Sequence, residues 1–374
     1  MDFTLCLTHD CNLRCAYCYA GAKLARRMTW EVARQAIDFG FRHTLQRAEL
    51  LGGPPKAQLG YFGGEPLLEW DLLQRSTEYA LEQAGREGIA LKKTVTTNMT
   101  LLDAAKAAWL RERGFHLGLS LDGNAAMHNA LRRTPDGRGS HEAAAAALEF
   151  FRGANPNGEV IIVVDPRNVQ HLADSIAWLL AEDIRSLSLN PNFYTPWKPA
   201  ALAEWRNQCE RVGDLYLAQY RRGVPVRINV IDGKIRTHLK EGYDACDQCG
   251  FGDGEIAIAA SGNIYPCERI VGDDTNEALR IGNVVDGFDV AQRARVMAGR
   301  GNRVKTCADC ALRSRCMNWC SCINYATTGY TDRVDGLVCH HERMVIAVAD
   351  HVGAALFSEK NPAFLSKFYG GTPA

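Results

Sequence analysis

Residues 9–21 read HDCNLRCAYCYAG and place Cys11, Cys15 and Cys18 within eight residues. Four thiolates complete the coordination of a zinc ion or of a cubane iron-sulfur cluster, whereas three leave one position without a protein ligand. The stretch follows FTLCLTH at 3–9, a short apolar run typical of a buried strand. The three thiols are therefore expected on a loop at the end of a strand.

The composition of the chain narrows the class of protein. Its 374 residues are 47% hydrophobic, which suffices for a large core and for two or three domains. Lys+Arg and Asp+Glu both total 43, so no net charge favours nucleic acid or an anionic membrane. The sequence has no long apolar span and no secretion signal, and we expect a soluble, cytoplasmic protein. In a reducing compartment, 14 cysteines indicate metal or redox chemistry rather than disulfides.

Six short apolar runs alternate with longer amphipathic stretches, a pattern typical of strand and helix units around a parallel sheet. We therefore predict an α/β fold, a partial (β/α)6 TIM-type barrel, whose chemistry lies at the C-terminal ends of the strands. The barrel is expected over 1–205, a connecting segment with a strand VPVRINV over 206–240, and a cysteine-rich domain over 241–374. The six expected strands are FTLCLTH (3–9), AQLGYFGG (57–64), KKTVTTN (92–98), FHLGLSLDG (115–123), EVIIVVD (159–165) and SLSLNPNF (186–193).

The spacing C-x3-C-x2-C, with Tyr17 directly before the last cysteine, resembles the signature of the radical S-adenosylmethionine (SAM) superfamily. The resemblance implies a [4Fe-4S] cluster on Cys11, Cys15 and Cys18, with SAM on the open iron and its cleavage to a 5'-deoxyadenosyl radical. The alternative is a zinc knuckle that borrows a histidine such as His9.

Later strand ends extend the resemblance over residues 4 to about 195. YFGGEP (61–66) resembles the family's GGEP segment, TTNMT (96–100) its TNGT with Met99 in place of glycine, and LSLDG (119–123) its ribose-contacting strand end. HNALR (128–132) resembles H-D-x-x-R with Asn129 in place of aspartate, and its arginine is expected at the SAM carboxylate. The SAM-contacting residues implied in this way are Tyr17, Gly63, Gly64, Glu65, Asn98, Ser120 and Arg132.

The C-terminal half carries a second cysteine pattern. Residues 246–267 contain C-x2-C-x12-G-x4-C, residues 307–320 contain C-x2-C-x5-C-x3-C, and Cys339 follows. This pattern resembles the SPASM domain, which implies two fully ligated auxiliary [4Fe-4S] clusters and three clusters in all, whereas zinc is the alternative for paired C-x2-C units. The implied ligands are Cys246, Cys249, Cys267 and Cys320 for one cluster and Cys307, Cys310, Cys316 and Cys339 for the other.

Cys246 departs from the wider spacing usual in that pattern, and Cys322 competes with Cys320, although the C-x3 spacing favours Cys320. Cys6 and Cys209 are expected to be small buried residues of the core.

The resemblance implies an enzyme that acts on a peptide or protein, with a reduced flavodoxin or ferredoxin as electron donor. Two substrate classes remain: a ribosomally made peptide that receives a cross-link or related oxidation, or a sulfatase whose Ser or Cys becomes formylglycine. YFGGEP in place of Q-G-G-E-P, and Ala20 in place of a tyrosine, favour the peptide. In the other direction, the chain begins almost at the cysteine motif, as the sulfatase maturases do, with no room for the leader-recognition domain that many peptide maturases carry at the front. A separate leader-peptide-recognition protein is a further expected partner. A non-enzymatic iron-sulfur electron carrier is a third alternative.

Glu268 follows Cys267 directly, where the sulfatase maturases carry an aspartate that serves as general base. The resemblance therefore implies that Glu268 is the catalytic base. The alternative is an ordinary ion pair with Arg269 or another surface cation.

Overall fold

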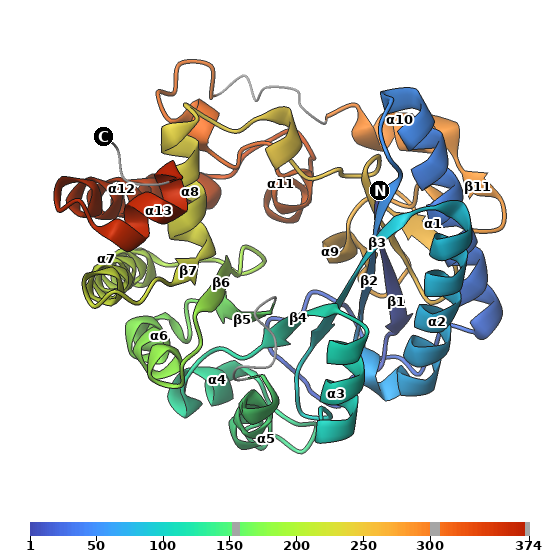
Figure 1. Cartoon of the computed structure of the whole chain (residues 1–374), viewed down its shortest axis with the longest axis horizontal. Coiled ribbons are helices and arrows are strands. Elements are labelled where there is room, and N and C mark those ends of the chain that lie inside the picture. Colours follow the sequence, from blue (N-terminus) through green and yellow to red (C-terminus); the bar gives the residue numbers. More distant parts are fainter. Residues whose placement is uncertain (152–157, 300–306, 371–374) are drawn as a thin grey trace.

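The computed structural model describes residues 1–151, 158–299 and 307–370. Its centre is a curved sheet in which six strands pair with their neighbours in chain order, all parallel, as the sequence predicts (Figure 1). These strands are β1 (Asp2–Thr8), β2 (Lys56–Gly63), β3 (Ala90–Thr97), β4 (Phe115–Ser120), β5 (Glu159–Val164) and β6 (Ser186–Pro191).

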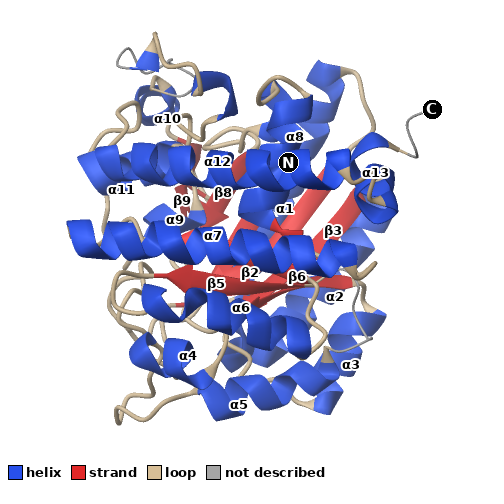
Figure 2. Ribbon diagram, turned by 90° about the vertical axis from the view of Figure 1, so that its left-hand side faces the viewer, coloured by secondary structure: helices blue, strands red, loops and turns tan. Residues whose placement is uncertain are grey.

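Helices cover the outer, convex face of this sheet (Figures 1 and 2). The first of them begins after Thr29, whose side chain accepts a hydrogen bond from the Val32 backbone N–H and so caps the helix. Fully buried side chains such as Ala33 and Ile37 face the strands. The outer helices are α1 (Trp30–Leu51), α2 (Trp70–Glu87), α3 (Ala104–Glu112), α4 (Ala125–Leu131), α5 (His141–Ala146) and α6 (Leu172–Ala181).

The connecting segment differs from its prediction. After α7 (Pro199–Arg221), the strand expected over 224–230 is reduced to β7 (Arg227–Ile228), and α8 (Asn229–Leu239) begins at once. Polar side chains cause the early helix start, because Asp232 Oδ2 accepts the Ile228 N–H at 2.8 Å and Asn229 Oδ1 accepts the Leu189 N–H at 2.8 Å. The strand expectation over the rest of this stretch was wrong.

The C-terminal region continues the same sheet. β8 (Glu255–Ile258) pairs in parallel with β1, so that β1 lies between β2 and β8. β9 (Asn263–Tyr265), β10 (Gly282–Asn283) and β11 (Gly287–Phe288) follow in antiparallel order. The short helix α9 (Glu268–Val271) leaves β9 and lies on the inner face of the sheet (Figure 1). The loop of residues 9–21, which we call the three-cysteine loop, reaches α9 and the residues after it: Arg269 lies over the Tyr19 ring, and a Cβ at Gly21 would lie 2.6 Å from Asp273 N.

The remaining helices are α10 (Val290–Met297), α11 (Ser321–Thr328), α12 (Gly336–Ser358) and α13 (Pro362–Tyr369). The longest, α12, packs against α7 and α8 and so joins the C-terminal region to the connecting segment. In the described part of the chain, no helix combines the length and the apolar character that a membrane span requires.

Candidate functional site

A cavity of about 570 Å³ opens on the inner face of the sheet, between the three-cysteine loop and α9. Residues from every predicted strand end contribute to its wall, together with residues of the C-terminal region. The structure thereby brings together eleven residues that the sequence singles out: Cys11, Cys15, Tyr17, Cys18, Gly63, Gly64, Glu65, Asn98, Ser120, Arg132 and Glu268.

Backbone hydrogen bonds fix the three-cysteine loop against the end of α4 on one side and the end of β2 on the other. Arg14 N–H donates to Arg133 O at 2.6 Å, and Ala16 N–H donates to Leu131 O at 2.9 Å. On the other side, Glu65 N–H donates to Asp10 O at 2.9 Å. The loop is therefore held between the end of β2 and the segment that follows α4.

Gly63 and Gly64 serve this contact. A Cβ at Gly64 would lie 1.9 Å from Asp10 O, and one at Gly63, whose φ is +127°, would lie 2.4 Å from Thr8 O. We expected these glycines to admit a ligand to the backbone; the close approach in the structure is to the backbone of the three-cysteine loop. Both glycines nevertheless line the cavity.

The Glu65 carboxylate is buried and ties the ends of β2 and β3 together. Its Oε1 accepts from Leu67 N–H at 3.0 Å and from the Thr97 hydroxyl at 2.7 Å. Its Oε2 accepts from Asn98 N–H at 2.7 Å. Burial raises the pKa of Glu65 to about 7, against the hydrogen bonds from Asn98, Thr97 and Leu67, which lower it.

Asn98 carries this connection on to the cysteines. Its Nδ2 donates to Asn12 Oδ1 at 2.8 Å and lies 3.7 Å from Cys11 Sγ. Its neighbour Met99 has a left-handed φ of +68° and is fully buried, which explains why a glycine is usual at this position in the family.

Asp122 is a site residue that the sequence analysis did not identify. It is fully buried two residues after Ser120, and its Oδ2 accepts from the Tyr17 hydroxyl at 2.6 Å. The same oxygen lies 3.1 Å from Arg132 Nε. Burial raises the pKa of Asp122, and the positive charge of Arg132 opposes that rise. The LSLDG motif offered a signal, because a carboxylate directly after a buried strand requires a partner.

The three cysteines of the three-cysteine loop line one cavity. Their side chains all contribute to its wall, and Lys23 Nζ donates to Cys18 Sγ at 3.0 Å. Burial raises the pKa of the Cys15 thiol to about 11.

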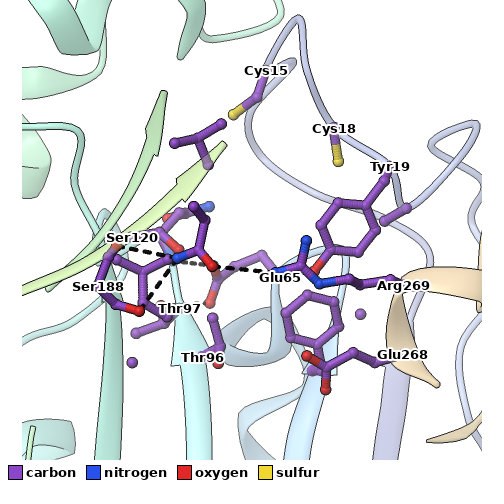
Figure 3. A pocket seen from close by; sticks show the side chains of 18 of the residues that line it. Cys15, Cys18, Tyr19, Glu65, Thr96, Thr97, Ser120, Ser188, Glu268 and Arg269 are labelled. Atoms are coloured by element: carbon purple, nitrogen blue, oxygen red, sulfur yellow. Dashed lines mark hydrogen bonds between the residues drawn. The ribbon is translucent and has the colours of Figure 1, made fainter. Parts of the chain in front are cut away.

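A further part of the cavity wall is formed by α9 and by an aromatic stack around Tyr19 of the three-cysteine loop (Figure 3). Tyr19 stacks on Phe62 and on Tyr194, with ring centroids 6.1 and 6.0 Å away, and the Arg269 guanidinium lies 5.6 Å from the Tyr19 ring centroid. Glu268 lines the cavity beside them, and burial raises the pKa of its carboxyl against the opposing charge of Arg269.

The predicted SPASM cysteines lie outside the cavity wall. Cys267 and Cys320 are buried, Cys249 is half-buried and Cys246 is exposed. Cys322, which the sequence analysis set second to Cys320, is buried next to it, with 3.5 Å between their sulfurs.

Cys307, Cys310, Cys316 and Cys339 are half-buried. Glu342 Oε2 of α12 accepts the Met317 N–H at 2.7 Å, and this bond places the Cys316 loop beside the helix that carries Cys339.

Sequence comparison matches the first half of the chain to a known family. Residues 5–179 match the family model described as the radical SAM superfamily. A cysteine-type anaerobic sulfatase-maturating enzyme of Clostridium perfringens strain 13 is 23% identical over 287 residues, which cover 74% of this chain and 75% of the relative. A serine-type enzyme of Klebsiella pneumoniae is 23% identical over 336 residues, covering 83% and 78%.

Solved structures share the fold over nearly the whole chain. The structure described as native anSMEcpe with bound AdoMet has a TM-score of 0.78 at 18% identity and covers 96% of this chain and 100% of that one. Streptococcus suis SuiB bound to its precursor peptide SuiA has a TM-score of 0.59 at 16% identity and covers 90% and 75%. Residues 5–179 are therefore a radical SAM domain, and the comparisons indicate that the protein is an enzyme.

Proposed function

We propose that this enzyme oxidises or cross-links a residue of a ribosomally made peptide. The observation that carries the proposal is the single cavity in which the three cysteine thiols, the strand-end residues and Glu268 meet. When bound, a [4Fe-4S] cluster with SAM supplies the electron and the 5'-deoxyadenosyl radical that removes a hydrogen atom from the substrate. A reduced flavodoxin or ferredoxin is the proposed electron source.

The chain's own residues would hold SAM from three sides. Arg132 supplies a buried positive charge for the SAM carboxylate, and its pairing with Asp122 fixes the guanidinium in place. The Gly63–Gly64 backbone and Glu65 would contact the SAM amino group, and Ser120 at the end of β4 would contact the ribose; all four residues line the cavity. Asn98 keeps Cys11 and Asn12 in register with β3.

Two auxiliary clusters on the C-terminal cysteines would accept the electron that a net oxidation releases. The buried positions of Cys267 and Cys320 support a site within the fold, and the second set lies where the Cys316 loop meets α12. Complete ligation of both clusters would leave no iron open to substrate.

Glu268 is the proposed general base. Its carboxyl lies in the cavity wall next to α9's link to Cys267, and its raised pKa suits the acceptance of a substrate proton near neutral pH. The substrate then loses a hydrogen atom to the radical, a proton to Glu268 and an electron to the auxiliary site.

A peptide substrate is supported by the neighbours, since solved structures include anSMEcpe with the Cp18Cys peptide and SuiB with SuiA. The positions at which this chain departs from the sulfatase-maturase motifs both lie in the cavity wall: Phe62 stands in place of glutamine and Ala20 in place of tyrosine. An altered wall favours a substrate other than a sulfatase. A separate leader-recognition protein remains a proposed partner.

Formylglycine formation is the second candidate, because the sulfatase-maturating relatives cover 74–83% of this chain. The neighbouring genes and an activity assay distinguish the two functions. We expect product with a short peptide encoded beside this gene and none with a sulfatase-derived Ser or Cys peptide, as followed by mass spectrometry. Product with the sulfatase peptide alone would reverse the order of the two candidates.

The base role is tested by Glu268→Gln, which keeps the shape of the side chain and removes its proton acceptor. We expect 5'-deoxyadenosine formation to persist while modified peptide falls at least ~100-fold. Product within a few-fold of the parent would leave Glu268 as a structural neighbour of Arg269.

A further inference from the structure

Three thiols from two distant segments meet behind α9. Cys267 precedes α9, and Cys320 and Cys322 lie at the start of α11. The sulfurs of Cys320 and Cys322 are 3.5 Å apart, and Cys322 also hydrogen-bonds with the Cys267 thiol. Cys322 is therefore the central member of the group, although the sequence pattern assigns it no role.

A cation lies close to these thiols. The Arg269 guanidinium interacts electrostatically with Cys267, Cys320 and Cys322. Cys320 is the N-cap residue of α11 and is itself buried. Such surroundings suit an iron-sulfur cluster, which carries net negative charge on its thiolate ligands.

Cys249 belongs to the same neighbourhood. Gly252 N–H, three residues after it, donates to Pro266 O at 3.0 Å, next to Cys267. Cys249 itself is half-buried and packs against the core.

Cys246 has different surroundings. Its side chain is exposed, and the 3-10 turn that carries it, Ala245–Asp247, has no buried residue. The turn is held at the surface by Lys240, whose Nζ lies 3.1 Å from Asp244 Oδ2 and 3.3 Å from Asp247 Oδ2.

We infer that Cys322, and not Cys246, is the fourth ligand of the first auxiliary cluster, with Cys249, Cys267 and Cys320 as the other three. This inference rests on the proposed function and changes the ligand set that the spacing implies. A four-iron cluster would separate sulfurs that touch in its absence, and all four ligands would then lie inside the fold. The loop of residues 244–248 would be free of the cluster.

The test uses a chain that holds only auxiliary iron. In Cys11→Ala/Cys15→Ala/Cys18→Ala, reconstituted without oxygen, we expect about eight irons per chain from two [4Fe-4S] clusters. Adding Cys322→Ser should lower iron to about four, or keep it with changed EPR g-values because an oxygen ligand replaces sulfur. Adding Cys246→Ser should leave both iron and EPR unchanged. Cys209→Ser, at a buried cysteine of α7, is the matched control.

Loss of a cluster in the Cys246→Ser variant overturns the inference, even if the Cys322→Ser variant fails to fold by circular dichroism. Unchanged iron and EPR in the Cys322→Ser variant overturn it as well. If the triple variant contains no iron, the inference is overturned, and so is the proposal that the C-terminal cysteines hold two auxiliary clusters. SAM cleavage by the parent chain tests the radical chemistry independently.

Discussion

At the scale of single residues, the ion pair of Arg132 and Asp122 links the proposed SAM site to the stability of the fold. The two side chains form a buried ion pair, with relative exposures of 7% and 0%, and Tyr17 supplies a hydroxyl to the same carboxylate. Removal of one partner from such a pair leaves an uncompensated charge, at a cost of about 3–5 kcal/mol. Truncation of Arg132 alone therefore changes both the stability of the fold and the proposed SAM affinity. A second substitution, at Asp122, can separate these two effects.

We expect Arg132→Ala to lower the free energy of unfolding by about 3–5 kcal/mol and to weaken SAM binding at least ~10-fold. Arg132→Ala/Asp122→Asn should recover much of the stability and none of the SAM affinity, because the carboxylate charge is removed but the cation is still missing. Urea unfolding and calorimetric SAM titration of the reconstituted protein measure the two quantities.

The control for this pair is Arg133→Ala, a neighbouring exposed arginine that should affect neither quantity. An unaltered SAM affinity in Arg132→Ala would show that the segment at 128–132 does not contact SAM.

The sequence identified cavity residues whose chemistry is local to a motif, such as Cys11, Glu65 and Arg132. It did not identify Asp122, because its importance depends on Tyr17, more than a hundred positions earlier in the chain. Cys322 is a similar case, since a spacing pattern contains no information on the contact with Cys267.

At the scale of elements, the end of β2 determines the position of the three-cysteine loop. The glycine at 64 permits a backbone approach that any side chain would prevent. The glycine pair at the end of β2 therefore acts first as a packing contact with the three-cysteine loop. Through this contact it determines the geometry of the cysteines.

Gly64→Ala should therefore displace the loop. A Cβ 1.9 Å from Asp10 O forces a main-chain shift, for which we expect a loss of stability of about 1–3 kcal/mol and lower iron in the SAM-binding site. Gly53→Ala is the matched control, since a Cβ there meets nothing within 4 Å. Iron content and thermal unfolding give the comparison, and equal values for both variants would contradict the packing role of Gly64.

Strand prediction was accurate where apolar runs were long and flanked by turns, as in β1 to β6. It was less accurate for β7, because side chains of Asn229 and Asp232 start a helix inside an apparent strand pattern. The pairing of β8 with β1 joins residues about 250 positions apart, and no local pattern predicts such a register.

At the scale of the whole molecule, the barrel and the cysteine-rich region share one sheet. β1 is hydrogen-bonded on both sides, to β2 and to β8, and α12 packs on α7 and α8. Neither part is complete alone, because the loss of residues after 240 would expose an edge of β1.

We expect the full chain to unfold in one cooperative transition, and a chain of residues 1–240 to aggregate because its β1 edge and the inner face of its sheet are uncovered. Size-exclusion chromatography and tryptophan fluorescence under urea test both statements, with the full chain prepared in parallel. A monomeric 1–240 fragment that forms 5'-deoxyadenosine would show that the barrel is independent of the C-terminal region.

The central claim is that Cys11, Cys15 and Cys18 hold a cluster that cleaves SAM. The most direct measurement compares the reconstituted parent with Cys11→Ala/Cys15→Ala/Cys18→Ala for iron content and for 5'-deoxyadenosine formed from SAM and a reductant. We predict a fall from about twelve to about eight irons per chain and complete loss of 5'-deoxyadenosine. Unchanged SAM cleavage in the triple variant would contradict the assignment of these cysteines and the radical mechanism built on them.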